Sequence, residues 1–157
     1  MVAPEYILKT AHSVGSVCFR DLVIASDYCD DLDNCGQPYE VFYVQDIFPH
    51  PYFSYYPFSY DFAIIQLDHP ASDIKPVSID LFNISNQFTE GKDLYVAGFG
   101  RTNSSFESET LQETMLEYVA NEQCVVTGWT ISDSFMCADR AGVSGCHGDS
   151  GGPLYDR

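Results

Sequence analysis

Basic residues are scarce in this chain, which has 7 Lys and Arg against 23 Asp and Glu and a formal net charge of −16. DNA, RNA and anionic lipid surfaces are recognised through patches of Lys and Arg, so this composition argues against all three as partners. The sequence also has no apolar run that approaches the ~20 residues of a membrane span. We therefore expect no nucleic-acid partner and no membrane partner.

A secretory leader is missing as well. The start, Met1–Glu5, lacks the basic residues and the apolar stretch of such a leader, which taken alone indicates a cytosolic protein. The cysteines indicate the opposite, because none has the Cys-x-x-Cys spacing of zinc sites and disulfides explain them better than a metal. Two glycosylation-type triplets agree with a secreted glycoprotein whose leader is absent from this sequence. The cysteines are Cys18, Cys29, Cys35, Cys124, Cys137 and Cys146, and the triplets are Asn83-Ile84-Ser85 and Asn103-Ser104-Ser105.

The 157 residues, 45% of them hydrophobic, are enough for one ordinary domain with a sizeable core. Short runs rich in Val, Ile, Tyr and Phe alternate with clusters of Asn, Asp, Gly and Pro, a pattern typical of antiparallel all-β sandwiches and barrels. Only Asn121–Val126 predicts a short helix, and a polar seam near Asp80–Gly91 could divide two small β modules. The predicted strands are Tyr6–Lys9, Val17–Ala25, Tyr39–Ile47, Phe62–Leu67, Asp93–Gly98, Leu111–Val119, Ser134–Ala138 and Gly152–Tyr155.

The most informative stretch is Gly148-Asp149-Ser150-Gly151-Gly152, followed by Pro-Leu. A glycine-rich turn of this kind can aim the backbone N–H groups of Gly148 and Ser150 at one point, where they would stabilise an oxyanion formed by attack of the serine. The stretch also fits the Gly-x-Ser-x-Gly elbow of α/β-hydrolases. In those enzymes the histidine follows the serine, and no histidine follows Ser150 here.

Four histidines are candidates for the base that would activate Ser150. His50 and His69 precede proline and are interpreted as turn residues, and the side chain of His147, three residues before the serine, need not face it. His12 follows a strand-like run. Asp61 opens the apolar run Phe62–Leu67, where a buried carboxylate would be costly without a partner that His12 can supply.

Together these elements resemble those of the trypsin- and chymotrypsin-like serine proteases. Thr10-Ala11-His12 is similar to the family's Thr-Ala-Ala-His element, Asp61-Phe62-Ala63-Ile64 to its Asp-Ile-Ala-Leu element, and Gly98-Phe99-Gly100 to its Gly-Trp-Gly turn. The order of histidine, aspartate and serine is also that of this class. The resemblance implies two antiparallel, six-stranded Greek-key barrels, with His12 and Asp61 in residues 1–85 and Ser150 in residues 86–157.

The resemblance also implies a function. His12 would be the general base, Asp61 its orienting partner, Ser150 the nucleophile, and the amides of Gly148 and Ser150 the oxyanion hole. Ser144, Gly145 and His147 would line the substrate pocket, and a serine at position 144, where trypsins carry an aspartate, implies an uncharged, apolar residue before the cut. Cys124 and Cys137 would form a disulfide. Protein or peptide substrates, protein inhibitors, no cofactor and no metal are expected.

The chain also departs from the family. Two-barrel enzymes of this kind have about 200–250 residues, so we expect a chain cut at both ends, with both barrels incomplete. Asp149 then lacks the amino terminus that normally pairs with it, Cys146 lacks its usual partner, and Ser13 stands where the family has a cysteine. The alternative function is therefore a weak or inactive homologue that binds a partner protein as a decoy.

Two clusters remain open. Acidic residues lie about where some members of the family have a calcium loop, but they lack the Asp-x-Asp-x-Asp-Gly pattern and such runs are usually solvated. Aromatic residues precede Asp61 in a loop that borders the family's apolar subsites, although core packing or loop cover explains them equally well. The acidic residues are Asp27, Asp30, Asp31, Asp33 and Glu40, and the aromatic ones are Tyr52, Phe53, Tyr55, Tyr56, Phe58 and Tyr60.

Overall fold

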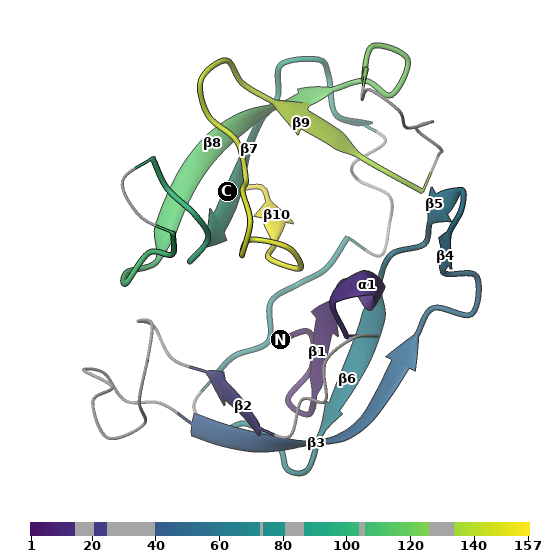
Figure 1. Ribbon diagram of the computed structural model, residues 1–157, viewed down its shortest axis with the longest axis vertical. Helices are drawn as coiled ribbons and strands as arrows, with labels where there is room; N and C mark the ends of the chain where they lie inside the picture. The colour runs from purple at the N-terminus through teal and green to yellow at the C-terminus, as the bar shows by residue number, and fades with distance from the viewer. Residues whose placement is uncertain (15–20, 25–39, 73, 81–86, 104–105, 126–133) are drawn as a thin grey trace.

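The structure is a computed structural model that describes residues 1–14, 21–24, 40–72, 74–80, 87–103, 106–125 and 134–157. Its strands pair antiparallel in two four-stranded sheets and one small hairpin, and one short helix follows the first strand (Figure 1). The elements are β1 (Tyr6–Lys9), α1 (Ala11–Val14), β2 (Asp21–Ile24), β3 (Glu40–Pro49), β4 (Ser54–Tyr55), β5 (Phe58–Ser59), β6 (Ala63–Leu67), β7 (Asp93–Gly98), β8 (Gln112–Val119), β9 (Cys137–Asp139) and β10 (Leu154–Tyr155).

The first sheet has the strand order β1-β6-β3-β2. Side chains alternate between the two faces of a strand, and in β6 Ala63, Ile65 and Leu67 are all buried while the residues between them are not. These three side chains form one core cluster with Phe42 of β3 and with the buried residues of α1. The sheet therefore buries the face on which α1 packs.

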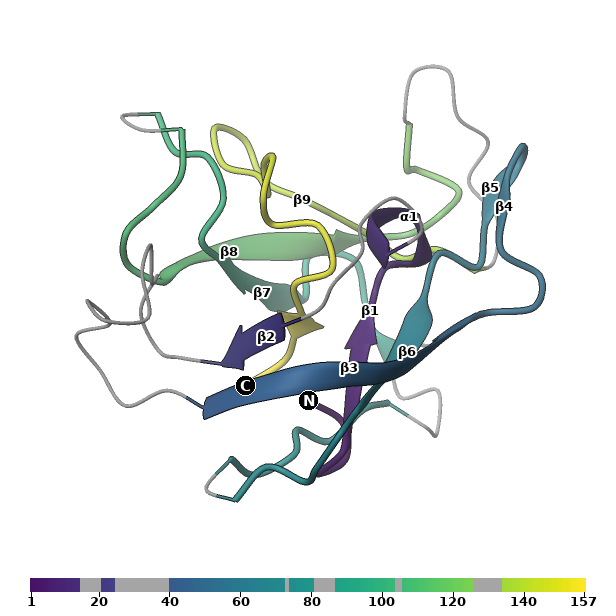
Figure 2. The same ribbon diagram turned by 60° about the horizontal axis from the view of Figure 1, so that its bottom comes forward.

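The second sheet has the order β10-β7-β8-β9. Leu94 of β7 and Leu116 of β8 are directly opposite each other and both buried, so this pair forms the centre of the second sheet's apolar face. Figures 1 and 2 show α1 and the segment leading into β10 between the two sheets. The predicted catalytic residues therefore lie near the middle of the molecule. His12 is on α1, next to the first sheet, and Ser150 is in the segment that leads into the second.

The all-β prediction is confirmed, and β7 has the predicted bounds. No closed barrel forms among the described strands, so the two-barrel architecture and the division into 1–85 and 86–157 stay predictions. The helix expected at Asn121–Val126 is wrong over its described part: the chain makes a turn there, in which the amide of Cys124 donates to the carbonyls of Ala120 and Asn121 at 3.0 and 3.2 Å. The strand predicted at Tyr6–Lys9 is confirmed as β1, but the sequence predicts no helix at Ala11–Val14, where α1 forms.

A disulfide joins Cys124, after β8, to Cys137, the first residue of β9, with the Cα atoms 6.2 Å apart. It ties the turn after β8 to β9, an edge strand of the second sheet. It is also the pair that the resemblance implies. Cys146 is a free, exposed thiol. No helix in the described part of the chain is long and apolar enough to cross a membrane.

Several sequence predictions fall outside the described residues. They concern the pairing of Cys18, Cys29 and Cys35, the acidic run at 27–33, the glycosylation triplet at 83–85, two residues of the triplet at 103–105, and half of the seam at 80–91.

The buried face of β6 can be tested with two equivalent substitutions. Ile65→Ala should lower the free energy of unfolding by about 2–5 kcal/mol because it leaves a cavity in the core, where Ile65 is 1% exposed. Ile64→Ala removes the same atoms from the other face of the strand and should cost clearly less. Urea unfolding of both variants measures this difference, and equal losses would contradict the assignment of the core face.

Candidate active site

His12 and Asp61 are in direct contact although 49 residues separate them in the sequence. His12 Nδ1 lies 2.6 Å from Asp61 Oδ2, and the backbone amide of His12 donates to Asp61 Oδ1 at 2.8 Å. The Asp61 side chain is only 10% exposed, whereas that of His12 is 36% exposed. A buried carboxylate that accepts from Nδ1 fixes the ring orientation and leaves Nε2 as the nitrogen able to take a proton.

Helix α1 sets the position of His12 at the end of β1. The hydroxyls of Thr10 and Ser13 lie 2.7 Å apart, and the Ser13 hydroxyl donates to the Thr10 carbonyl at 2.9 Å, so both side chains close the first turn. Ala11 and Val14 are buried in the core and anchor the turn to the first sheet. Ser13 thus fixes the turn by hydrogen bonds at the position where the family has a cysteine.

A tight turn places Asp61 before β6. Tyr60 has a φ of 51°, which is uncommon for a bulky residue, and its carbonyl accepts from the amide of Phe62 at 2.8 Å. The His50 ring stacks on the Tyr60 ring with centroids 4.8 Å apart, and the His50 amide donates to the Phe62 carbonyl at 2.9 Å. Sequence reasoning missed this support, because a histidine before proline gives no sign of the ring on which it stacks.

Ser150 lies on an exposed loop that packs against the end of β1. Lys9 donates from Nζ to the Ser150 carbonyl at 3.2 Å, across 141 residues of sequence. Gly151 has a φ of 83°, and a Cβ placed there would lie 3.3 Å from the amide nitrogen of Thr10. The loop therefore reaches the strand that leads directly into His12. Within the described residues, no hydrogen bond joins the Ser150 hydroxyl to His12.

Two backbone amides in this loop have no acceptor within the part of the chain that the structure describes. Among the described residues, neither Gly148 N–H nor Ser150 N–H donates a hydrogen bond, whereas the intervening Asp149 N–H donates to the Cys146 carbonyl at 3.0 Å. Gly148 has a φ of 97°, a conformation that favours glycine. The two amides predicted to form the oxyanion hole are thus both available to an acceptor.

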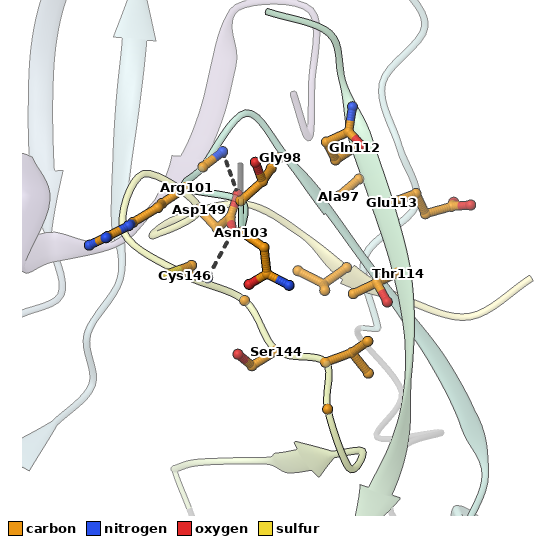
Figure 3. A pocket seen from close by; sticks show the side chains of 16 residues that line it. Ala97, Gly98, Arg101, Asn103, Gln112, Glu113, Thr114, Ser144, Cys146 and Asp149 are labelled. Carbon is orange, nitrogen blue, oxygen red and sulfur yellow. Dashed lines mark hydrogen bonds between the residues drawn. The ribbon is translucent and has the colours of Figure 1, made fainter. Parts of the chain in front are cut away.

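Backbone amides from two other residues hold the Asp149 carboxylate. Its two oxygens accept from the amides of Gly100 and Cys146, both at 2.8 Å, as the dashed lines in Figure 3 show. A Cβ on Gly100 would lie 2.5 Å from this carboxylate, and one on Gly98 would also collide with it. The expectation that Asp149 lacks a partner is therefore wrong: two backbone dipoles take the place of a cation.

Behind the serine loop lies a cavity of about 540 Å³ between β7, the start of β8 and residues 142–146. Ser144, Gly145 and the exposed Cys146 line it, and Asp149 forms part of its wall (Figure 3). Neither Ser150 nor His147 belongs to the lining; the His147 carbonyl instead accepts from the amide of Arg101 at 2.8 Å. A substrate-binding role for Ser144, Gly145 and His147 stays a prediction.

Gly100→Ala should destabilise the fold at the serine loop. The added methyl group has to displace the Asp149 carboxylate, so we expect the free energy of unfolding to fall by about 1–3 kcal/mol, the usual cost of overpacking. Gly145→Ala is the matched control, since nothing lies within 4 Å of its Cβ position. Denaturant unfolding of both variants measures the effect, and equal stabilities would show that Asp149 does not require glycine at position 100.

Comparison with known proteins agrees with this arrangement. The family model described as Trypsin matches residues 1–157. Ovochymase of Halocynthia roretzi is 30% identical over 165 aligned residues, which cover 100% of this chain and 10% of the ovochymase. The chain thus spans about one tenth of the length of this curated relative. A family match over the whole chain, together with a histidine–aspartate pair beside a glycine-rich serine loop, shows that the chain belongs to the trypsin family of serine proteases.

Proposed function

We propose that this protein is a serine endopeptidase in which Ser150 is the nucleophile, His12 the general base and Asp61 the group that orients His12. The contact of 2.6 Å between His12 and Asp61 carries the proposal, because it turns the imidazole into a base of fixed orientation. The contact between the serine loop and the end of β1 supports it, since it brings Ser150 to the strand that ends at His12.

The reaction follows from these roles. His12 Nε2 takes the hydroxyl proton as Ser150 Oγ bonds to the peptide carbonyl carbon, and the N–H groups of Gly148 and Ser150 stabilise the oxyanion. The C–N bond then breaks as His12 gives its proton to the leaving amine. Water, deprotonated by His12, releases the acyl group and restores Ser150. Asp61 stays ionised throughout. The missing Ser150–His12 hydrogen bond is compatible with these steps, since such bonds are often long before substrate binds.

An aromatic hairpin beside His12 supports an apolar substrate segment. Phe58 of β5 lies 6.1 Å, between ring centroids, from both the His12 ring and the Phe135 ring. Tyr52, Tyr55 and Tyr56 are 73%, 53% and 93% exposed, so these side chains are not core residues. An aromatic surface next to the base suits apolar side chains flanking the cut. The substrates would be proteins or peptides, and protein inhibitors would bind the same surface.

A binding-only decoy is the second candidate. The observation that favours it is the absence, within the described residues, of a hydrogen bond between the Ser150 hydroxyl and His12. A decoy would bind its partner equally well as wild type and as Ser150→Ala, with no hydrolysis by either protein. An enzyme would cleave the partner only with Ser150 present.

The proposed place of action is outside the cell. Relatives of the trypsin family are typically secreted, and the disulfide between Cys124 and Cys137 suits an oxidising compartment. Glycosylation at Asn83 or Asn103 would fit the same location. Peptide mapping of protein secreted by eukaryotic cells tests both.

Labelling with a fluorophosphonate tests the catalytic assignment. We expect the probe to modify Ser150 in the purified protein, Ser150→Ala to abolish labelling, and Asp61→Asn to lower kcat by on the order of 10⁴-fold, because the amide stabilises the wrong imidazole tautomer. His69→Gln is the control; this exposed histidine stacks on Phe42 and should leave labelling unchanged. No labelling of the wild-type protein would overturn the enzyme assignment.

Position 144 tests the proposed preference before the cut. A serine there carries no charge, so we expect peptide esters with Phe or Leu before the scissile bond to react faster than those with Arg or Lys. Ser144→Asp should shift the ratio of kcat/KM values toward Arg and Lys, since a carboxylate lining the pocket attracts a cation. Faster cleavage after Arg by the wild-type protein would contradict this role for Ser144.

A further inference from the structure

Lys9 places an ammonium group beside the serine loop. It is the last residue of β1, where it pairs with the fully buried Ala63 of β6, and it donates to the Ser150 carbonyl at 3.2 Å. None of the ion pairs in the described part of the chain includes Lys9. Burial lowers the pKa of Lys9. Partial burial of a cation without a carboxylate partner is unfavourable, so some other interaction has to compensate for the position of Lys9.

The stem of Lys9 packs on the residue after the nucleophile. A Cβ on Gly151 would lie 2.8 Å from Lys9 Cγ and 3.0 Å from Lys9 Nζ, so the bare Gly151 backbone lies against this side chain. Lys9 therefore touches both Ser150 and Gly151, while its own backbone continues through Thr10 and Ala11 to His12. One side chain joins the strand that carries the base to the loop that carries the nucleophile.

The neighbouring charges do not account for this placement. The titratable groups on the elements around Lys9 include His12 on α1 and Asp61 before β6. The serine loop adds Cys146, His147 and Asp149. His12 and Asp61 bind each other, and Asp149 accepts from Gly100 and Cys146. The acceptor that Lys9 does contact is a backbone carbonyl, and a charged donor makes such a hydrogen bond roughly twice as strong as a neutral one.

We propose that Lys9 is a positioning residue that clamps the serine loop to β1 and so sets the distance between Ser150 and His12. The inference rests on the proposed peptidase function and assigns it one more residue. A gap between nucleophile and base is sensitive to small shifts: a displacement of about 1 Å can cost on the order of 10²-fold in rate. The clamp would act on the chemical step and not on the binding of substrate.

Two substitutions separate the clamp from simple packing. Lys9→Met keeps an apolar stem and removes the ammonium, and it should lower kcat by about 10- to 100-fold with KM nearly unchanged, because the lost interaction serves the transition state. Lys9→Arg keeps a charged donor and should recover much of the loss. Lys92→Met is the matched control: its ammonium pairs with Asp156 and not with the serine loop, and kcat should stay at the wild-type value.

The pH dependence of kcat distinguishes the clamp from packing, because packing alone would not change it. Wild-type kcat should fall at alkaline pH as Lys9 loses its proton, below the ordinary lysine value of about 10.4. Lys9→Met should lack this alkaline decline, and Lys9→Arg should shift it upward because arginine stays protonated. Wild-type kcat and pH profile in Lys9→Met would overturn the clamp. A wild-type protein without any turnover would instead overturn the proposed function itself.

Stability provides a measurement that does not depend on activity. Lys9 binds its proton less tightly in the folded than in the unfolded chain, so between its lowered folded pKa and about 10.4 the unfolded state holds more protons. The wild type should therefore gain stability relative to Lys9→Met as pH rises through this window. Urea unfolding across the window measures the difference, and a difference independent of pH would contradict burial of the ammonium against the loop.

Discussion

Asp61 holds His12 at two points, the ring nitrogen and the backbone amide, and this double contact needs two unusual pieces of backbone to meet. One is the single helical turn that ends β1, and the other is the turn at Tyr60, whose φ of 51° is supported by the stacked ring of His50. The core of the first sheet anchors both, through Ala11 on one side and Ala63 on the other. The packing of a small apolar cluster thus determines the orientation of the imidazole.

Much of the architecture could be predicted from the sequence, because alternating burial leaves a strong pattern. The strand at Asp93–Gly98 and the buried face of Ala63, Ile65 and Leu67 are examples. The pairing of His12 with Asp61 could be predicted too, since a carboxylate at the start of an apolar strand needs a partner. The helix after β1 could not, because Thr10-Ala11-His12 fits the end of a strand equally well, and only tertiary packing decides between them.

The partner of Asp149 illustrates what a sequence does not reveal. A half-buried acidic side chain suggests a cation, yet here two peptide N–H groups, from Gly100 and Cys146, satisfy both oxygens. Backbone amides are present at every residue and so leave no signal in the sequence. The only trace is the pair of glycines in Gly98-Phe99-Gly100, which make room for the carboxylate. Lys9 is a similar case, because its acceptor is also a main-chain group.

The proposed catalytic groups come from both sheets: His12 and Asp61 from the first, and Ser150 from the loop that enters β10 of the second. The alignment of these groups therefore depends on the packing of the two sheets against each other. It can be lost while each sheet is still intact. Mild heat or low denaturant that separates the two sheets would then abolish the proposed activity. The strands, and with them the far-ultraviolet circular dichroism, would still be unchanged.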